Sequence, residues 1–220
     1  MSLARRLTLD DVSALVRLAD PQWSPDGAEV LVGVVRPDWG ANQYTTELRS
    51  IEVATGRART WMAPRPGIHH ARWWPDGRGV VFLGPDGGHA QIFALDAPGG
   101  TPRRLTRSPT GVRSFAVHPT ARVLAFAALD PPARAADPHN RAFEVTDHDL
   151  FGTEPLRDAH LWLVDADGQV WPLTSGGTGV NVEADMPGGP RAYAWSPDGR
   201  QLALLAQPAP GVRGIHALTL

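Results

Sequence analysis

The sequence predicts an all-β fold, a partial β-propeller of four-stranded antiparallel blades, and three observations lead to this prediction. A pattern of Trp, one further residue and Pro-Asp-Gly occurs at Trp23–Gly27, Trp73–Gly77 and Trp195–Gly199, and a degraded copy occupies Val117–Ala121. Short apolar runs follow each copy, and the many Gly (23) and Pro (21) residues separate these runs. Repeats several tens of residues apart that are rich in short strands are typical of radially repeated blades.

The first twenty residues predict a short helix and a lead-in segment (1–20). Thr8 is expected to cap the helix together with Asp11, and apolar residues fall on one helical face as far as Ala19. Asp20-Pro21 is expected to end the helix. This stretch carries charges throughout and has no apolar core like that of a signal peptide, so a cytoplasmic location is expected.

Each repeat predicts the same series of four strands. The first strand ends at the aromatic residue, and the Pro-Asp-Gly turn closes a hairpin because Pro presets φ and Gly accepts a positive φ. In the degraded copy Ala121 replaces Gly, and a left-handed alanine there would cost about 1 kcal/mol. The tryptophans are expected to pack between blades. The expected incomplete propeller domain is 21–220, with blades at about 21–61, 70–106, 113–174 and, in part, 193–220.

The last predicted blade is incomplete, because the sequence ends just after its third strand. Closed propellers use about four to eight blades, so the 220 residues are expected to be the front part of a longer polypeptide or one component of a nicked one. A self-contained protein made by pairing two half-rings is the alternative. An unclosed ring exposes apolar faces and a strand edge, and the isolated chain is therefore expected to oligomerise, aggregate or fold loosely.

The third blade is interrupted by an insertion at 128–159. Long loops within compact repeats are often functional. The best-placed polar residues of the insertion, and hence the candidate substrate-binding residues, are Arg141, Glu144, Asp147 and His148. His139 with Asp147–Asp149 would be the cluster most suited to a metal ion, but a solvated loop is the simpler interpretation, since no metal-binding motif accompanies it.

Composition and motifs argue against several classes of function. The net charge is −2, from 21 basic residues that are all Arg and 23 acidic ones, so no nucleic-acid or membrane partner is expected. The chain has no Cys, which excludes disulfides and thiolate metal sites. It contains no G-x-S-x-G pentapeptide, and the glycine-rich Ser175–Gly179 lacks the lysine of a P-loop. We therefore assign no catalytic residue, no metal ligand and no cofactor to this chain.

Three segments in series carry a resemblance to a known family. Thr8–Val12 leads into the first Trp repeat, Asn42–Tyr44 suggests a long hairpin tip, and His160–Asp165 follows the insertion and precedes the last Trp repeat. This order resembles the N-terminal part of the prolyl oligopeptidase family of serine peptidases, in particular its acylaminoacyl-peptidase-like branch. The Trp repeat alone is shared with TolB-like propellers, and the opening helix joined to the first blade discriminates better.

The resemblance implies a two-domain enzyme, in which a propeller covers the active site of an α/β-hydrolase domain and admits short peptides. The catalytic Ser, Asp and His of such enzymes lie in the hydrolase domain. The chain would then be the gating segment of a serine peptidase for short or N-blocked peptides. Its partners would be the C-terminal hydrolase domain of the same polypeptide and short peptides. It would also offer a surface for the formation of homo-oligomers. The alternatives are a non-enzymatic TolB- or WD-like propeller that binds proteins, and a propeller with a metal in its channel.

Overall fold

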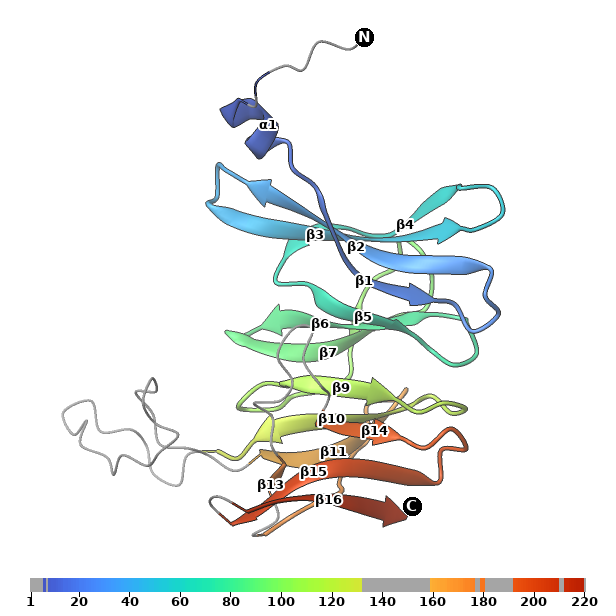
Figure 1. Ribbon diagram of the computed structural model, residues 1–220, viewed down its shortest axis with the longest axis vertical. Helices are drawn as coiled ribbons and strands as arrows, with labels where there is room; N and C mark the ends of the chain where they lie inside the picture. Colours follow the sequence, from blue (N-terminus) through green and yellow to red (C-terminus); the bar gives the residue numbers. More distant parts are fainter. Residues whose placement is uncertain are drawn as a thin grey trace, which may run out of the picture.

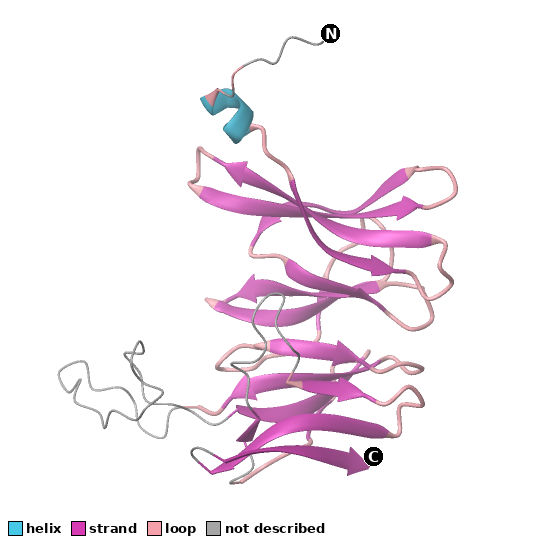
Figure 2. Cartoon of the chain, viewed as in Figure 1, coloured by secondary structure: helices cyan, strands magenta, loops and turns pink. Residues whose placement is uncertain are grey.

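The computed structural model describes residues 6, 8–131, 159–176, 179–180, 192–209 and 212–219 of the 220-residue chain. These residues form four antiparallel sheets that follow one another along the molecule, with one short helix at the N-terminal end (Figures 1 and 2). Each sheet contains four strands. The predicted fold class, an all-β partial propeller, is confirmed.

The helix α1 (Leu9–Ser13) has the predicted N-terminus and an end that comes earlier than predicted. Asp11 N–H donates to Thr8 Oγ1, and Thr8 N–H donates to Asp11 Oδ2 at 2.8 Å, which makes a complete capping box. The expected continuation to Asp20 is wrong, because the chain is already a strand from Arg17 and pairs with Val35. Sheet pairing there overrides a helical pattern that residues on one face alone suggested.

The first two blades have consecutive strands in consecutive places. Blade 1 contains β1 (Arg17–Trp23), β2 (Glu29–Asp38), β3 (Gln43–Glu52) and β4 (Ala58–Pro66). Blade 2 contains β5 (His69–Trp73), β6 (Val80–Asp86), β7 (His89–Leu95) and β8 (Arg103–Arg104). The long β2–β3 hairpin agrees with the predicted tip near Asn42–Tyr44, and Asn42 takes a left-handed φ of 47° in the turn.

The third blade keeps this order, and the fourth blade departs from it. Blade 3 contains β9 (Ser114–Val117), β10 (Val123–Leu129), β11 (Ala159–Asp165) and β12 (Val170–Pro172). Blade 4 contains β13 (Gly179–Val180), β14 (Tyr193–Trp195), β15 (Gln201–Ala209) and β16 (Val212–Thr219). Both β13 and β14 pair with one edge of β15, and β16 pairs with the other edge. Sequence analysis missed β13, whose two residues are too few for a periodic signal.

The Pro-Asp-Gly turns have the predicted conformation, with Gly27 at φ 72° and Gly199 at φ 73°. Ala121, in the degraded copy, is not among the described residues with a positive φ, so the expected cost does not arise. His118 holds this turn instead, because its Nδ1 accepts from the N–H groups of Thr120 at 3.2 Å and Ala121 at 3.0 Å. A side chain that bonds the turn backbone thus replaces the glycine.

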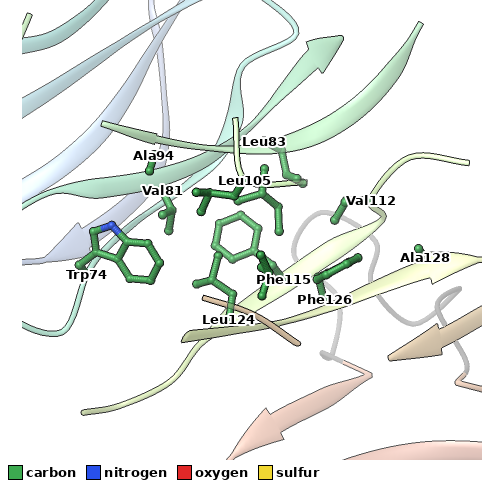
Figure 3. Close-up of a cluster of buried hydrophobic side chains, with 12 residues drawn as sticks. Trp74, Val81, Leu83, Ala94, Leu105, Val112, Phe115, Leu124, Phe126 and Ala128 are labelled. Carbon is green, nitrogen blue, oxygen red and sulfur yellow. The ribbon is translucent and has the colours of Figure 1, made fainter. Parts of the chain in front are cut away.

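The hydrophobic core lies between blades rather than within a single sheet. Figure 3 shows the cluster between blades 2 and 3, where Trp74 and Leu83 of blade 2 meet Phe115 and Leu124 of blade 3. Equivalent clusters join blade 1 to blade 2 and blade 3 to blade 4. Burial of apolar faces against neighbouring blades is therefore the main stabilising contribution.

The expectation that the repeat tryptophans pack between blades holds for two of the three. Trp73 is 8% exposed and lies edge-on to Trp61 of blade 1, with ring centroids 5.3 Å apart. Trp195 is partly buried and lies 4.7 Å from the ring of His118 of blade 3. Trp23 of blade 1 is 64% exposed, so the expectation is wrong for this residue.

Candidate functional site

The ends of the strands form two faces that differ in construction. The Pro-Asp-Gly turns and the β3–β4, β7–β8 and β11–β12 turns lie at one end of the blades, here called the turn face (Figure 1, right). The β2–β3 and β6–β7 connections, the end of β10 and the start of β11 lie at the other end, here called the tip face (Figure 1, left). Insertions that differ between repeats often map to one face of a repeat protein and mark its binding face.

On the turn face, the Pro-Asp-Gly turns of blades 1 and 4 are held by the same bonds. Ser24 Oγ donates to Asp26 Oδ1 at 2.6 Å, and Ser196 Oγ donates to Asp198 Oδ1 at the same distance. These hydroxyl groups, with the backbone N–H groups of Ala28 and Arg200, lower the pKa of both aspartates below the usual range. Bonds that repeat in this way serve the turn itself and do not indicate a specific site.

A hollow of about 300 Å³ opens on the turn face between blades 1 and 2. Its lining includes the carboxylates of Asp26, Glu29 and Asp96, the guanidinium groups of Arg59 and Arg78, and the indoles of Trp61 and Trp73. The Arg59 and Glu29 side chains lie 3.7 Å apart, and Arg59 is largely exposed, so this pair contributes little stability. The lining mixes both signs of charge, and the lowered pKa of Asp26 keeps that carboxyl ionised rather than ready to donate a proton.

The tip face carries exposed aromatic side chains at the end of the long β2–β3 hairpin. Trp39 is 65% exposed and Tyr44 is 67% exposed, on either side of the turn. At the neighbouring β6–β7 tip, Asp86 forms an ion pair with Arg104. Large exposed aromatics combine an apolar body with a polar group and are frequent in binding surfaces.

A buried histidine with partners at both ring nitrogens lies at the root of the insertion on the tip face. Leu129 of β10 pairs directly with Ala159 of β11, and the insertion connects these strands. His160 is 5% exposed, and its Nδ1 lies 2.9 Å from Asp130 Oδ1. His160 Nε2 lies 3.0 Å from the carbonyl oxygen of Gly176. The ring is therefore held from both nitrogens, by the Asp130 carboxylate on one side and a backbone carbonyl oxygen on the other.

His160 also occupies a position that is polar in every complete blade. The registers make it equivalent to Glu47 of blade 1 and Gln91 of blade 2. Thr60 Oγ1 donates to Glu47 Oε1 at 3.0 Å, and Thr106 Oγ1 donates to Gln91 Oε1 at 2.8 Å. All three residues thus join the third strand of a blade to the chain that follows it, which is a structural role.

Glu47 shows the electrostatic cost of this buried position and how it is met. Burial would raise the pKa of its carboxyl, but hydrogen bonds from Arg49 and Thr60 and the nearby charge of Arg36 leave the pKa lowered. Arg49 Nε lies 2.7 Å from Glu47 Oε1, and Arg36 lies 3.5 Å from Oε2. A buried charge is tolerated when it is paired and hydrogen-bonded in this way.

The candidate substrate-binding residues Arg141, Glu144, Asp147 and His148, and His139, lie outside the described residues. Within the part of the chain that the structure describes, no group of three or more His, Asp or Glu side chains could hold a metal ion. Sequence analysis did not single out Trp39 or the Asp130–His160 pair. The sequence signals that could have identified them are an aromatic residue at a predicted hairpin tip, for Trp39, and a histidine next to the insertion, for His160.

The described helix has five residues, and no described helix is long and apolar enough to cross a membrane.

No protein-family profile matches the chain. Half of the sequence nevertheless aligns with a peptidase. The chain is 32% identical over 111 residues to the uncharacterised peptidase YuxL of Bacillus subtilis strain 168, which is 50% of this chain and 17% of that protein.

Solved structures share the fold over most of the chain. An acylaminoacyl peptidase of Pyrococcus horikoshii superposes with a TM-score of 0.61 at 16% identity, over 88% of this chain and 28% of that one. TolB of Acinetobacter baumannii superposes with a TM-score of 0.54 at 15% identity, over 93% of this chain and 41% of that one. The chain spans well under two thirds of the length of each of these proteins.

Proposed function

We propose, from the confirmed likeness of this chain to the propeller portion of prolyl oligopeptidase-family peptidases, that it is the substrate-gating segment of a serine peptidase. The substrates would be short or N-blocked peptides, and the hydrolase domain would follow in the same polypeptide. The observation that supports this proposal most is the alignment of half the chain with a peptidase sequence, at an identity well above that of the structural neighbours.

The chemistry of such an enzyme would be supplied by the hydrolase domain. A serine attacks the peptide carbonyl, a histidine moves the proton, and an oxyanion hole stabilises the tetrahedral intermediate. The present chain would contribute size selection and part of the wall around the substrate. A cytoplasmic location, short peptides as ligands and a homo-oligomeric surface stay predictions.

The tip face is where we place the substrate-facing surface. It has the long β2–β3 hairpin with exposed Trp39 and Tyr44, and the root of the insertion at Asp130 and His160. On the turn face, by contrast, blades 1 and 4 repeat the same Ser–Asp bond. The polar residues of the insertion, Arg141, Glu144, Asp147 and His148, stay proposed contacts for the substrate.

A non-enzymatic scaffold of the TolB type is the second candidate. The observation in its favour is the fold similarity to TolB of Acinetobacter baumannii, whose TM-score of 0.54 is not far below that of the peptidase. In this case the tip face would bind a protein, and no hydrolase domain would be present.

The test uses the native polypeptide that carries residues 1–220, isolated from its source organism with a tag at its N-terminus. We expect covalent labelling by a fluorophosphonate serine probe, and cleavage of an acetylated dipeptide anilide but not of casein. A polypeptide with neither labelling nor cleavage would contradict the peptidase and leave the scaffold.

The same polypeptide with Trp39→Ala and Tyr44→Ala tests the tip face. We expect a change of at least about threefold in the ratio of kcat/KM between dipeptide and octapeptide substrates, which corresponds to roughly 0.7 kcal/mol of differential transition-state binding. Trp171→Ala is the matched control, because Trp171 is also exposed (46%) but lies on the outermost strand β12. An unchanged ratio would place the substrate elsewhere.

A further inference from the structure

The seam between blades 2 and 3 is closed on the turn face by one arginine. Arg122 Nε lies 2.8 Å from Asp76 Oδ2, and Arg122 Nη2 lies 3.2 Å from Asp76 Oδ1. Arg122 Nη1 lies 3.4 Å from Asp96, and the guanidinium lies 5.7 Å from the centre of the Trp74 ring. A bidentate arginine of this kind fixes the turn of one blade to the next blade.

The seam between blades 1 and 2 has the residues for the same clamp but does not form it. Arg78 stands three residues after the turn proline, as Arg122 does, and Asp26 corresponds to Asp76 of the following turn. Arg78 and Asp26 instead line the hollow of about 300 Å³. In the part of the chain that the structure describes, the Arg78 side chain is exposed and forms no hydrogen bond or ion pair.

Glu29 supplies an acceptor without a partner in the same hollow. Its Oε2 is buried and accepts no hydrogen bond within the described structure. Its Oε1 lies 3.7 Å from Arg59 Nη1, which is longer than a hydrogen bond. A buried acceptor that lacks a donor costs free energy. Glu29 and Arg59 also line a second hollow of about 150 Å³, so there is space on the surface for a donor to reach this carboxylate.

The indoles of the hollow are fixed and have no N–H left to offer. Trp61 Nε1–H donates to Ser50 Oγ at 3.1 Å, and Trp73 Nε1–H donates to the carbonyl oxygen of Gln22 at 3.4 Å. The two rings lie edge to face, with centroids 5.3 Å apart. They present carbon and π surface, which accepts the apolar part of a ligand and attracts a cation.

We infer that this hollow binds a zwitterionic amino acid or dipeptide, with its carboxylate on Arg78 and its ammonium group on Glu29. A guanidinium matches a carboxylate in shape and charge, and an ammonium group brings the donors that Glu29 Oε2 lacks. A simple anion would leave Glu29 unsatisfied, and a simple cation would leave Arg78 without a partner. The volume of about 300 Å³ is at the lower end of small-molecule sites, which suits a ligand of this size.

The inference uses residues of blades 1 and 2 only. The chain itself joins these blades, and the Gly99 N–H donates across the seam to the carbonyl oxygen of Trp61 at 2.9 Å. The inference does not rest on the proposed peptidase function, because the hollow opens on the turn face and the surface proposed for the substrate is the tip face. Either proposal can therefore fail without the other.

The experiment is isothermal titration calorimetry of the native polypeptide that carries residues 1–220, after reaction with the fluorophosphonate probe to block a serine active site. The ligands are L-alanine, the dipeptide Ala-Ala, its N-acetyl derivative and its C-terminal amide. We expect saturable binding of alanine or Ala-Ala, and the tighter of the two gives the length of the ligand. The N-acetyl derivative and the amide each lack one charge and should bind at least about tenfold more weakly than Ala-Ala.

Variants assign each charge of the ligand to its residue. Arg78→Gln should bind Ala-Ala and its amide equally, and Arg78→Lys should still prefer Ala-Ala, because it keeps the positive charge. Glu29→Gln should bind Ala-Ala and its N-acetyl derivative equally. Arg200→Gln is the matched control, since Arg200 has the same place in the blade 4 turn but lines neither hollow, and it should leave all affinities unchanged.

Each variant is first compared with the parent by near-ultraviolet circular dichroism. Arg78 is exposed and Glu29→Gln keeps the shape of the side chain, so we expect unchanged spectra. The inference is overturned if neither alanine nor Ala-Ala binds the parent, or if a blocked derivative binds as tightly as Ala-Ala. It is also overturned if Arg78→Gln still prefers Ala-Ala to its amide, because the carboxylate would then lie elsewhere.

Discussion

Gly199 and Gly27 occupy the same place in two Pro-Asp-Gly turns but have different surroundings. Both have a left-handed backbone, with φ of 73° and 72°. A Cβ on Gly27 would meet nothing within 4 Å, whereas a Cβ on Gly199 would come within 2.3 Å of His118 Cε1 and Nε2. Gly27→Ala therefore measures the backbone cost alone, and Gly199→Ala measures this cost together with the displacement of His118.

The two magnitudes can be worked out separately. A left-handed alanine costs about 1 kcal/mol relative to glycine, which is the expected loss for Gly27→Ala. The strongest hydrogen bonds of the His118 ring are to Gly199 O at 3.1 Å and from the N–H groups of Thr120 and Ala121. At about 1 kcal/mol each, its displacement adds roughly 2–3 kcal/mol, so Gly199→Ala should lower the free energy of unfolding by about 3–4 kcal/mol.

A double-mutant cycle separates these contributions. His118→Ala alone should cost about 2–3 kcal/mol, and Gly199→Ala added to it should cost only the backbone term of about 1 kcal/mol. The assay is urea unfolding followed by tryptophan fluorescence, at a protein concentration below that of self-association. If Gly199→Ala costs no more than Gly27→Ala, His118 does not join blade 3 to blade 4 in the way the structure indicates.

Two other predictions concern burial and acid stability. Leu48→Ala, at a position 1% exposed, should lower the free energy of unfolding by about 2–5 kcal/mol. Ile215 stands at the same register position of blade 4 but is 81% exposed, so Ile215→Ala should change the free energy of unfolding by less than about 0.5 kcal/mol. Equal losses in urea unfolding would contradict this difference in burial. The pKa of Asp198 is lowered from 3.8 by the Ser196 hydroxyl and the Arg200 N–H, so its contribution to stability is present above pH 3.8 and is lost as the pH falls through the lower folded-state pKa. Asp198→Asn should therefore flatten the acid side of the stability profile between pH 2 and 5, and an unchanged profile would refute this.

The repeat pattern predicted the blades well because turn chemistry and strand alternation are local. Thr8 with Asp11 was sufficient to predict the start of α1, since a capping box involves only neighbouring residues. The end of α1 was not predictable in the same way, because Arg17 pairs with Val35, which lies in another strand. The exposure of Trp23 was likewise missed, since its sequence is the same as that of the covered copies and only the absence of a preceding blade in the described chain distinguishes it.

The candidate site was less predictable than the fold, and His160 illustrates why. A buried histidine next to an insertion, with a carboxylate 2.9 Å away, suggests proton transfer when it is considered alone. Comparison with Glu47 and Gln91 shows that this place in a blade takes a polar residue that bonds to the following chain, whatever its type. Asp130 also has a counterpart in blade 1, because Arg36 stands at the same place beyond the second strand and lies 3.5 Å from Glu47. The His160–Asp130 pair therefore repeats an arrangement that blade 1 makes with Glu47 and Arg36, and its geometry alone indicates a structural role.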